Sequence, residues 1–283
     1  MYLIVDSGST KTDWGLCENE NLLKTIQTQG INPCHQDAAT INRILVGELL
    51  PEMKDTAPQQ IERIHYYGAG CATVTICNEM AGLLGSIFTN AAITTDSDML
   101  GAARALCGHS EGIACVLGTG SNSCMFNGEK IIDQIPSLGY ILGDEGSSAA
   151  IGRRLISDCL KRQLPQNVAN SFMKKYGLTT DSIIENVYRK PMANRYMAGF
   201  TPFLEDKRKI PEVHKILVSC FQEFFRRNVM NYRRAWLPVN FVGSLAATFS
   251  AELSEAAESL GLSVGTIMKS PMEGLVAYHN FHQ

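Results

Sequence analysis

In the segment IVDSGSTKTDWG, residues 4–15, a short apolar run ends in Asp6 and small, hydroxyl-bearing residues follow. Apolar residues at 2–5 and 12–17 predict two strands joined by a tight polar turn. Gly8 lets the backbone turn and approach a ligand closely. Such a loop suits a polyphosphate, with Lys11 as a positive charge, Asp6 as a Mg²⁺ ligand, and hydroxyl donors at Ser7, Ser9, Thr10 and Thr12. The alternative is an ordinary hairpin with a polar tip.

The same pattern returns in the middle of the chain. Residues 113–117 predict a buried strand, and the GTGS segment from Gly118 through Thr119 and Gly120 to Ser121 forms a second small polar loop. Further strands are predicted at 124–126 and 130–135, around the hairpin signal Asn127-Gly128. The repeated pattern predicts two related halves, and strands that alternate with helices predict an α/β fold.

The domains are therefore expected at residues 1–108 and 109–270, on either side of a nucleotide cleft, with a final helix at 271–283 that packs back on the first domain. Helical spacing of apolar residues predicts helices at 38–53, 98–107, 146–162, 167–176, 211–235 and 246–260. Strands are predicted at 22–27, 61–67, 87–94 and 240–242.

A third glycine site, Gly243-Ser244, ends a strand and opens a helix. Close approach to a base or ribose is one use for this glycine, and tight helix packing is the alternative. Two common nucleotide-binding motifs are excluded, because GxxxxGK[ST] does not occur and Gly68-Ala69-Gly70 continues in a way that fails GxGxxG.

Two acidic segments are candidates for chemistry. Asp96 and Asp98 lie where a strand ends and a helix begins, the usual ligand-binding edge of an α/β sheet. Asp96 is favoured as a general base that takes a proton from a substrate hydroxyl, and Asp98 as a helix N-cap. Asp144 and Glu145, bracketed by glycines, either bind sugar hydroxyls or simply cap a helix.

Composition limits the class of protein. The 283 residues carry 25 Lys+Arg against 28 Asp+Glu, a net charge of −3, so nucleic acid is not the expected partner. The nine cysteines contain no CxxC pair, which favours free thiols in a reducing cytosol. No signal peptide and no apolar run of about 20 residues is found, so a cytoplasmic protein without a membrane partner is expected.

In order along the chain, IVDSGSTKTDWG, TTD, LGTGSNS, LGDEGSS and FVGS resemble the BadF/BadG/BcrA/BcrD-type ATPase family, and within it the N-acetylglucosamine kinases. The resemblance spans nearly the whole chain, and GTGSN followed by GDEGS is its specific part. It implies two ribonuclease-H-like domains of the actin-like ATPase fold with a nucleotide between them. The implied activity is ATP-dependent phosphorylation of an amino sugar, most specifically N-acetylglucosamine to its 6-phosphate.

Residue roles follow from the same resemblance. It implies that Asp6 lies near Mg²⁺ and that Asp96 is the catalytic base, which also touches the sugar. The implied ATP-binding residues are Gly8, Ser9, Thr10, Lys11, Gly118, Thr119, Gly120, Gly243 and Ser244. The implied sugar-binding residues are Asn32, Ser121, Asn122, Gly139 and Asp144.

The sequence departs from the kinases at two aromatic positions of the sugar pocket. A tryptophan of the family is replaced by Cys34, and the Gly-Gly-Trp-Gly segment reads Pro-Ser-Leu-Gly here, with Leu138 at the aromatic position. Another hexose such as glucosamine therefore stays open as the acceptor.

Two other functions stay open as alternatives. Relatives in the same family are ATPases that activate radical dehydratases through a [4Fe–4S] cluster, although the cysteines here have no obvious cluster spacing. A sugar-sensing repressor would need an N-terminal DNA-binding segment, for which the first strand leaves no room. Family members are often dimers, so a homodimer is a further expectation.

Overall fold

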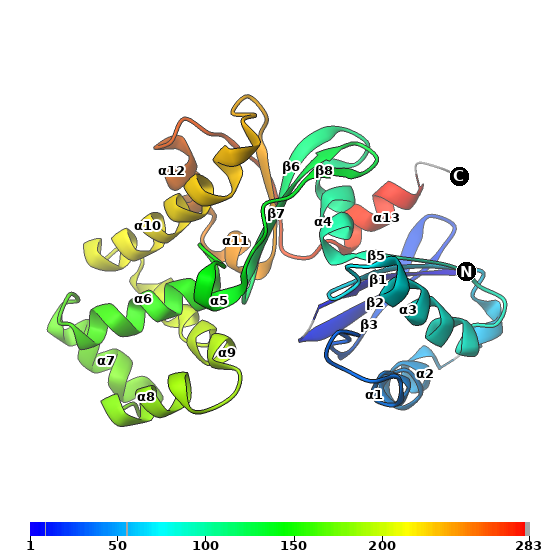
Figure 1. The fold of residues 1–283 in the computed structure, drawn as a ribbon, viewed down its shortest axis with the longest axis horizontal. Coiled ribbons are helices and arrows are strands. Elements are labelled where there is room, and N and C mark those ends of the chain that lie inside the picture. Colours follow the sequence, from blue (N-terminus) through cyan, green and yellow to red (C-terminus); the bar gives the residue numbers. More distant parts are fainter. Residues whose placement is uncertain (9, 55, 281–283) are drawn as a thin grey trace. The chain divides into compact units, whose positions relative to one another are not determined.

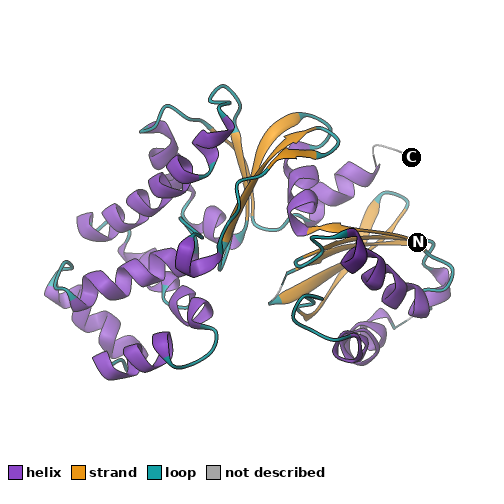
Figure 2. Ribbon diagram, viewed as in Figure 1, coloured by secondary structure: helices purple, strands orange, loops and turns teal. Residues whose placement is uncertain are grey.

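The computed structural model describes residues 1–8, 10–54 and 56–280. The chain divides into two compact units, each of which contains one five-stranded sheet. Unit 1 comprises Met1–Glu111, Asn127–Ile131 and Ser270–Gln283, and unit 2 comprises Gly112–Phe126 and Ile132–Lys269. Both units combine strands with helices, which confirms the expected α/β class (Figure 2).

The sheet of unit 1 has the strand order β3-β2-β1-β4-β5 (Figure 1). Its strands are β1 (Tyr2–Ser7), β2 (Lys11–Glu18), β3 (Asn21–Gln29), β4 (Arg63–Gly68) and β5 (Ala92–Ser97). The first three strands form an antiparallel meander, whereas β1, β4 and β5 run parallel. Ser7, Gly68 and Ser97 are therefore in register at the carboxyl edge of the sheet, where open α/β sheets bind ligands.

Helices cover both faces of this sheet. One face, with Val5 and Trp14, packs against α1 (Ala38–Ile44), the π-helical turn Leu45–Leu49, α2 (Leu50–Met53) and α3 (Val74–Ile87). The other face, with Tyr2, Ile4 and Tyr67, packs against α4 (Asp98–Cys107) and α13 (Met272–Asn280), the red helix of Figure 1. Helix α13 lies against α4 and β1, so the last helix joins unit 1.

One strand was predicted too early. Residues 87–94 were expected to form a strand, but helix α3 runs to Ile87 and β5 begins only at Ala92. The hydroxyl of Thr73 caps α3 by accepting a hydrogen bond from the N–H of Ile76 at 3.3 Å. Met80 and Leu84 then lie one helical turn apart and are buried. The apolar residues around 87–94 thus belong partly to the end of a helix.

The sheet of unit 2 repeats the topology of the first. Its order β10-β9-β6-β7-β8 places the first strand of the unit at the centre, as β1 is in unit 1. Strands β6, β9 and β10 run parallel. Its strands are β6 (Glu111–Leu117), β7 (Ser121–Asn127), β8 (Ile131–Asp133), β9 (Val239–Val242) and β10 (Val264–Met268). The shared order supports two related ribonuclease-H-like halves.

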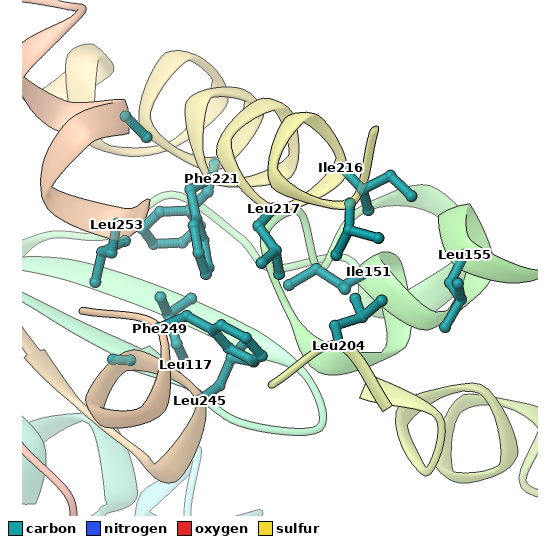
Figure 3. Packing of buried hydrophobic residues seen from close by; sticks show 14 of the residues in the cluster. Leu117, Ile151, Leu155, Leu204, Ile216, Leu217, Phe221, Leu245, Phe249 and Leu253 are labelled. Atoms are coloured by element: carbon teal, nitrogen blue, oxygen red, sulfur yellow. The ribbon is translucent and has the colours of Figure 1, made fainter. Parts of the chain in front are cut away.

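The helices of unit 2 form a large core against its sheet. Phe221 of α10, Leu253 of α12 and Ile151 of α6 belong to one buried cluster with Leu117, the last residue of β6 (Figure 3). Burial of one such phenylalanine stabilises the fold by about 1.5–3 kcal/mol. The helices are α5 (Gly139–Leu142), α6 (Ser148–Leu160), α7 (Gln166–Tyr176), α8 (Thr180–Tyr188), α9 (Ala193–Ala198), α10 (Pro211–Arg227), α11 (Ser244–Thr248) and α12 (Ser250–Glu258).

Helices α8 and α9 were not predicted, and α10 ends at Arg227 rather than continuing to residue 235. Short 3₁₀ turns occupy Pro58–Gln60, Thr201–Lys207 and Val229–Tyr232. Within the described ranges, no helix has the length and apolar character that a bilayer crossing requires.

Candidate functional site

The hairpin between β1 and β2 is closed by its backbone. The N–H of Gly8 donates to the carbonyl of Lys11 at 2.9 Å, and the carbonyl of Thr10 accepts from the N–H of Gly30 at 3.2 Å. A Cβ added at Gly8 would lie 3.5 Å from the Lys11 oxygen, an ordinary contact. The turn itself therefore does not require glycine. A ligand that approaches the backbone closely would require it, because a side chain at this position would stand in its way. Ser9 lies outside the described residues.

Two of the expected hydroxyl donors have another task. Ser7 and Thr12 are fully buried, and their hydroxyls are 2.7 Å apart. Ser7 also donates to the carbonyl of Ile31 at 3.0 Å, and Thr12 accepts from the N–H of Ile31 at 3.2 Å. The interpretation of these two as phosphate donors was wrong, because they fix the following loop to the hairpin. Thr10, in contrast, is exposed.

The charge of Lys11 is already partnered. Its ammonium lies 2.6 Å from the carboxylate of Asp13, which also accepts a hydrogen bond from Gln27 at 2.8 Å. The side chain of Lys11 is 55% exposed, whereas that of Asp13 is 8% exposed. A phosphate would have to share Lys11 with Asp13, a carboxylate that sequence analysis did not single out.

Asp6 lies in a negative environment at the end of β1. It stands opposite Asp13 on β2 and beside Tyr67 on β4. Burial, followed by the negative charges of Asp13 and Asp98, raises the pKa of Asp6 to about 7, while Lys11 lowers it. A bound cation would relieve this repulsion, so the residue type and surroundings fit the magnesium role expected for Asp6.

Asn32 lies beside the end of β4. Its side-chain oxygen accepts from the N–H of Cys34 at 3.0 Å, and the Cys34 thiol donates to the carbonyl of Gly70 at 3.3 Å. A Cβ added at Gly70 would lie 2.3 Å from the side-chain oxygen of Asn32, and Gly70 has a φ of +86°. Glycine is therefore required there so that the Asn32 loop can pack against the carboxyl edge of the sheet.

Asp96 is the penultimate residue of β5, and its side chain is 37% exposed. Its carboxylate accepts from Arg104 at 3.2 Å, and Arg104 also donates to the hydroxyl of Tyr67 at 2.9 Å. Asp96 and Tyr67 are in register on neighbouring strands, on the face that α4 and α13 cover. The carboxylate expected to be the base is thus part of an ion pair with the second half of α4.

Asp98 follows the last residue of β5 directly, at the carboxyl edge of the sheet. Ser97 is the N-cap of α4, accepting from the N–H of Leu100 at 3.2 Å, so the cap role expected for Asp98 was wrong. Asp98 opens the helix and accepts from the N–H of Met99 at 2.8 Å. Burial raises the pKa of Asp98, although backbone hydrogen bonds such as that of Met99 lower it. Its charge acts on Asp6.

In unit 2 the loop after β6 rests on the first turn of α6. The N–H of Gly118 donates to the carbonyl of Gly120 at 3.0 Å and closes the turn. The carbonyls of Gly118 and Thr119 accept from the N–H groups of Ser148 at 2.9 Å and Ala149 at 3.2 Å. A Cβ added at Gly118 would meet no atom within 4 Å, so the space beside this glycine is open.

Asp144 lies directly against this loop. Its carboxylate accepts from the N–H of Ser121 at 3.1 Å, and a Cβ added at Gly120 would lie 3.0 Å from the same oxygen. Burial raises the pKa of Asp144; the hydrogen bond from Ser121 lowers it and the charge of Glu145 raises it. The structure therefore brings Gly120, Ser121 and Asp144 together, and the lack of a side chain at Gly120 makes room for the carboxylate.

Asn122 and Gly139, the other residues of unit 2 that were predicted to bind sugar, have surroundings that differ from those of Asp144. The side-chain oxygen of Asn122 accepts from the N–H of Ser123 at 2.9 Å and from Gln134 at 3.2 Å. Gly139 is exposed with a φ of +70°, and no atom lies within 4 Å of its added Cβ. Glu145 forms an ion pair with Arg227 at 2.7 Å, so its carboxylate has a different partner from that of Asp144.

Gly243 is required by close packing. It has a φ of +132°, and a Cβ on it would lie 2.1 Å from the carbonyl oxygen of Leu117. Since Val116 and Val242 are in register on parallel strands, Gly243 brings the end of β9 against the strand that leads into the Gly118 loop. Ser244, at the start of α11, is exposed at the same edge.

Sequence reasoning missed Asp13, Tyr67 and Arg104. The signal for Asp13 was present, because a residue opposite Asp6 follows from the length of the hairpin. Cys34 is exposed, whereas the other cysteines are buried or half-buried. Within the described ranges, no three His, Cys, Asp or Glu side chains form a group that could hold a metal ion by themselves.

The chain is similar over its full length to solved structures. The putative N-acetylglucosamine kinase from Porphyromonas gingivalis is 46% identical, with a TM-score of 0.96, and the match covers 100% of this chain and 99% of that one. A scan against protein-family models and a search of curated proteins gave no match. Membership of the BadF/BadG-type family stays a prediction.

More distant structures show the fold alone. The putative N-acetylglucosamine kinase from Chromobacterium violaceum is 16% identical, with a TM-score of 0.65, over 98% of this chain and 99% of that one. A ROK-family glucokinase from Streptomyces griseus, solved with glucose and AMPPNP, is 14% identical, with a TM-score of 0.54, over 99% and 98%. These likenesses agree with the actin-like ATPase fold. By its identity over the full length, the chain belongs to the family of the Porphyromonas gingivalis protein.

Proposed function

We propose that the chain is an ATP-dependent sugar kinase whose acceptor is N-acetylglucosamine and whose product is the 6-phosphate. The observation that carries this proposal is the 46% identity, over the full chain, to a protein described as a putative N-acetylglucosamine kinase. The position of phosphorylation rests on the motif resemblance. Glucosamine and other hexoses are the competing acceptors, because the aromatic positions of the motif family hold Cys34 and Leu138 here.

The ATP phosphates would be held by loop backbone and hydroxyls. In unit 1 these come from Gly8 to Lys11, with exposed Thr10 as the hydroxyl that is available. In unit 2 they come from Gly118 and Thr119, and open space beside Gly118 supports close approach of a ligand. Ser244 would contact the nucleotide, whereas Gly243 acts through packing on Leu117.

Asp6 would hold Mg²⁺ directly or through water. Mg²⁺ is commonly bound by one or two carboxylates together with phosphates and water, so a larger group of protein ligands is not needed. When bound, the ion would neutralise charge on the transferred phosphoryl group. The raised pKa of Asp6 supports the role, because repulsion from Asp13 and Asp98 is what a cation would remove.

The sugar would be recognised by polar groups with fixed orientation. Asp144 is the strongest candidate, because the N–H of Ser121 fixes one of its oxygens and leaves the other for sugar hydroxyls. Asn32 is held by its contacts with Cys34 and Gly70. Asn122, Ser121 and Gly139 remain proposed contacts from the motif resemblance.

We assign the role of general base to Asp98 instead of Asp96. Asp96 has Arg104 as its partner, whereas Asp98 begins α4 at the carboxyl edge of the sheet, and its charge acts on Asp6. In the reaction, the sugar hydroxyl oxygen forms a bond to the γ-phosphorus while the bond from that phosphorus to the β,γ-bridging oxygen breaks. Asp98 takes the hydroxyl proton, and ADP leaves. A raised pKa makes this carboxylate a stronger base than an ordinary aspartate.

Product analysis tests the acceptor and its position. The protein is incubated with Mg-ATP and N-acetylglucosamine, and the product is examined by mass spectrometry and ³¹P–¹H correlation NMR. A mass gain of one phosphoryl group with phosphorus coupled to the C6 protons is the expected result. Coupling to another position, or no phosphorylated sugar, would contradict the proposal.

A further inference from the structure

The last turn of α13 is joined to α4 through a network of polar side chains in unit 1. Arg104 of α4 donates to the hydroxyl of Tyr67 at 2.9 Å, and that hydroxyl lies 2.9 Å from Nε2 of His279. Since the tyrosine oxygen accepts from Arg104, its proton is available to the imidazole. The ring of Tyr278 lies 5.2 Å from the guanidinium carbon of Arg104, a cation–π contact. Tyr278 thus contacts Arg104 directly, and His279 is linked to it through the hydroxyl of Tyr67.

Close packing leaves α4 little freedom to move. A Cβ added at Gly101 would lie 2.7 Å from the ring of Tyr67, and one added at Gly274 would lie 2.4 Å from the carbonyl oxygen of Ala105. The helix therefore lies against Tyr67 on one side and against α13 on another, at distances that only glycine permits. Its rotation and its position along its axis are set by these contacts together with Arg104.

Asp98 is the first residue of this ten-residue helix. A helix of this length moves as a rigid element, so a shift at Arg104 is transmitted to the carboxylate at the other end. Tyr67 is also the strand neighbour of both Asp6 and Asp96. The same side chain therefore contacts the helix that carries the proposed base and stands beside the proposed magnesium ligand.

We propose that Tyr67, Arg104 and His279 form a positioning network for Asp98, and that the last turn of α13 is part of the catalytic apparatus. In this role the three side chains act by fixing α4. This inference rests on the proposed kinase function for its catalytic part. Its structural part, the restraint of α4 by α13, is independent of the reaction.

Tyr67→Phe is the test, because it removes the shared hydroxyl and keeps the ring against Gly101. Tyr2→Phe is the matched control. Tyr2 belongs to the same apolar cluster and donates to the side chain of Asn280 at 2.8 Å, but no hydrogen bond joins it to Arg104 among the described residues. Both variants lose one tyrosine hydroxyl that contacts α13, and they differ in whether the bond to Arg104 is lost.

Amide hydrogen exchange, followed by mass spectrometry, gives a readout that does not depend on catalysis. Tyr67→Phe is expected to increase exchange within residues 98–107 several-fold, whereas Tyr2→Phe increases it in α13 alone. Equal exchange of α4 in both variants would overturn the network. His279→Gln, which tests the same contact from α13, should resemble Tyr67→Phe.

Kinetics then tests the catalytic part. In Tyr67→Phe, kcat should fall roughly tenfold with the KM values for sugar and ATP nearly unchanged, because a misplaced base affects the reaction rather than binding. Tyr2→Phe should keep the kcat of the wild-type protein. Loosened α4 with unchanged kcat would overturn the positioning role. If the wild-type protein phosphorylates no sugar, the proposed function fails, while the exchange result still decides whether α13 restrains α4.

Discussion

The negative charge of Asp98 at the start of α4 helps to raise the pKa of Asp6 at the end of β1 to about 7. Both carboxylates lie at the carboxyl edge of the sheet of unit 1, where β4 separates β1 from β5, and each has a distinct proposed role. Asp6 is the proposed ligand of a cation, and Asp98 is the proposed acceptor of the proton from the sugar hydroxyl. Asp98 differs from Asp96 in this respect, because Asp96 forms an ion pair with Arg104.

Replacement of the two aspartates distinguishes these roles. Asp98→Asn should lower kcat by about 10²–10⁴, the usual contribution of a general base. Asp96→Asn should change kcat less than about fivefold, because Arg104 keeps its hydrogen bond to Tyr67 and an amide oxygen remains as acceptor. Steady-state kinetics of the two purified variants measures this. The reverse order of effects would return the role of base to Asp96.

The raised pKa of Asp6 predicts a pH dependence of stability in the ligand-free protein. Folded Asp6 holds its proton up to about pH 7, whereas unfolded aspartate releases it near pH 4, so the folded state binds more protons between these values. The free energy of unfolding should therefore fall as pH rises through this window, by up to roughly 1.4 kcal/mol per pH unit from this group.

Chemical denaturation between pH 4.5 and 8 measures that slope. Asp6→Asn should reduce this slope, since the amide does not titrate, whereas Asp98 and Asp144, whose pKa values burial also raises, keep their contributions. Mg²⁺ with ATP should also reduce the slope of the wild-type protein near neutral pH, because a bound cation stabilises ionised Asp6. An unchanged slope in Asp6→Asn would show that Asp6 ionises normally.

The two loop glycines of unit 2 should respond differently to alanine. Gly118→Ala adds a methyl group to open space, so stability should change within about 0.5 kcal/mol while KM for ATP rises. Gly243→Ala places a Cβ 2.1 Å from the carbonyl oxygen of Leu117 and keeps a φ of +132°, which should destabilise the fold by about 2 kcal/mol or more. Thermal unfolding and ATP titration check both variants. Equal stability losses would contradict the packing role of Gly243.

Asp144 offers a test of sugar recognition. Asp144→Asn retains an oxygen that can accept from the N–H of Ser121 but loses the charge, so KM for the sugar should rise at least about tenfold. KM for ATP should stay nearly constant. Glu145→Gln is the matched control, because Glu145 is engaged by Arg227. A larger effect of Glu145→Gln on the sugar would move that role to the neighbouring residue.

Much of the fold could be predicted from sequence, since apolar strands enclose a polar loop in both halves and the two sheets share one strand order. The directions of single side chains could not. Successive strand residues face opposite sides, so the face on which Asp96 lies depends on the register of β5. The sequence pattern placed this strand at residues 87–94, whereas β5 begins at Ala92 and ends at Ser97. Hydroxyls posed the same problem: Thr10 is exposed, but Thr12 is buried against Ser7.

The proposed kinase function is tested most directly by ADP release from Mg-ATP with N-acetylglucosamine, glucosamine, N-acetylmannosamine, glucose or no sugar. The account predicts that N-acetylglucosamine raises the rate far above the rate without sugar and above the rate with any other sugar. A rate independent of sugar, or no ADP release at all, would contradict it. Iron analysis of anaerobically purified protein would then test the ATPase-activator alternative.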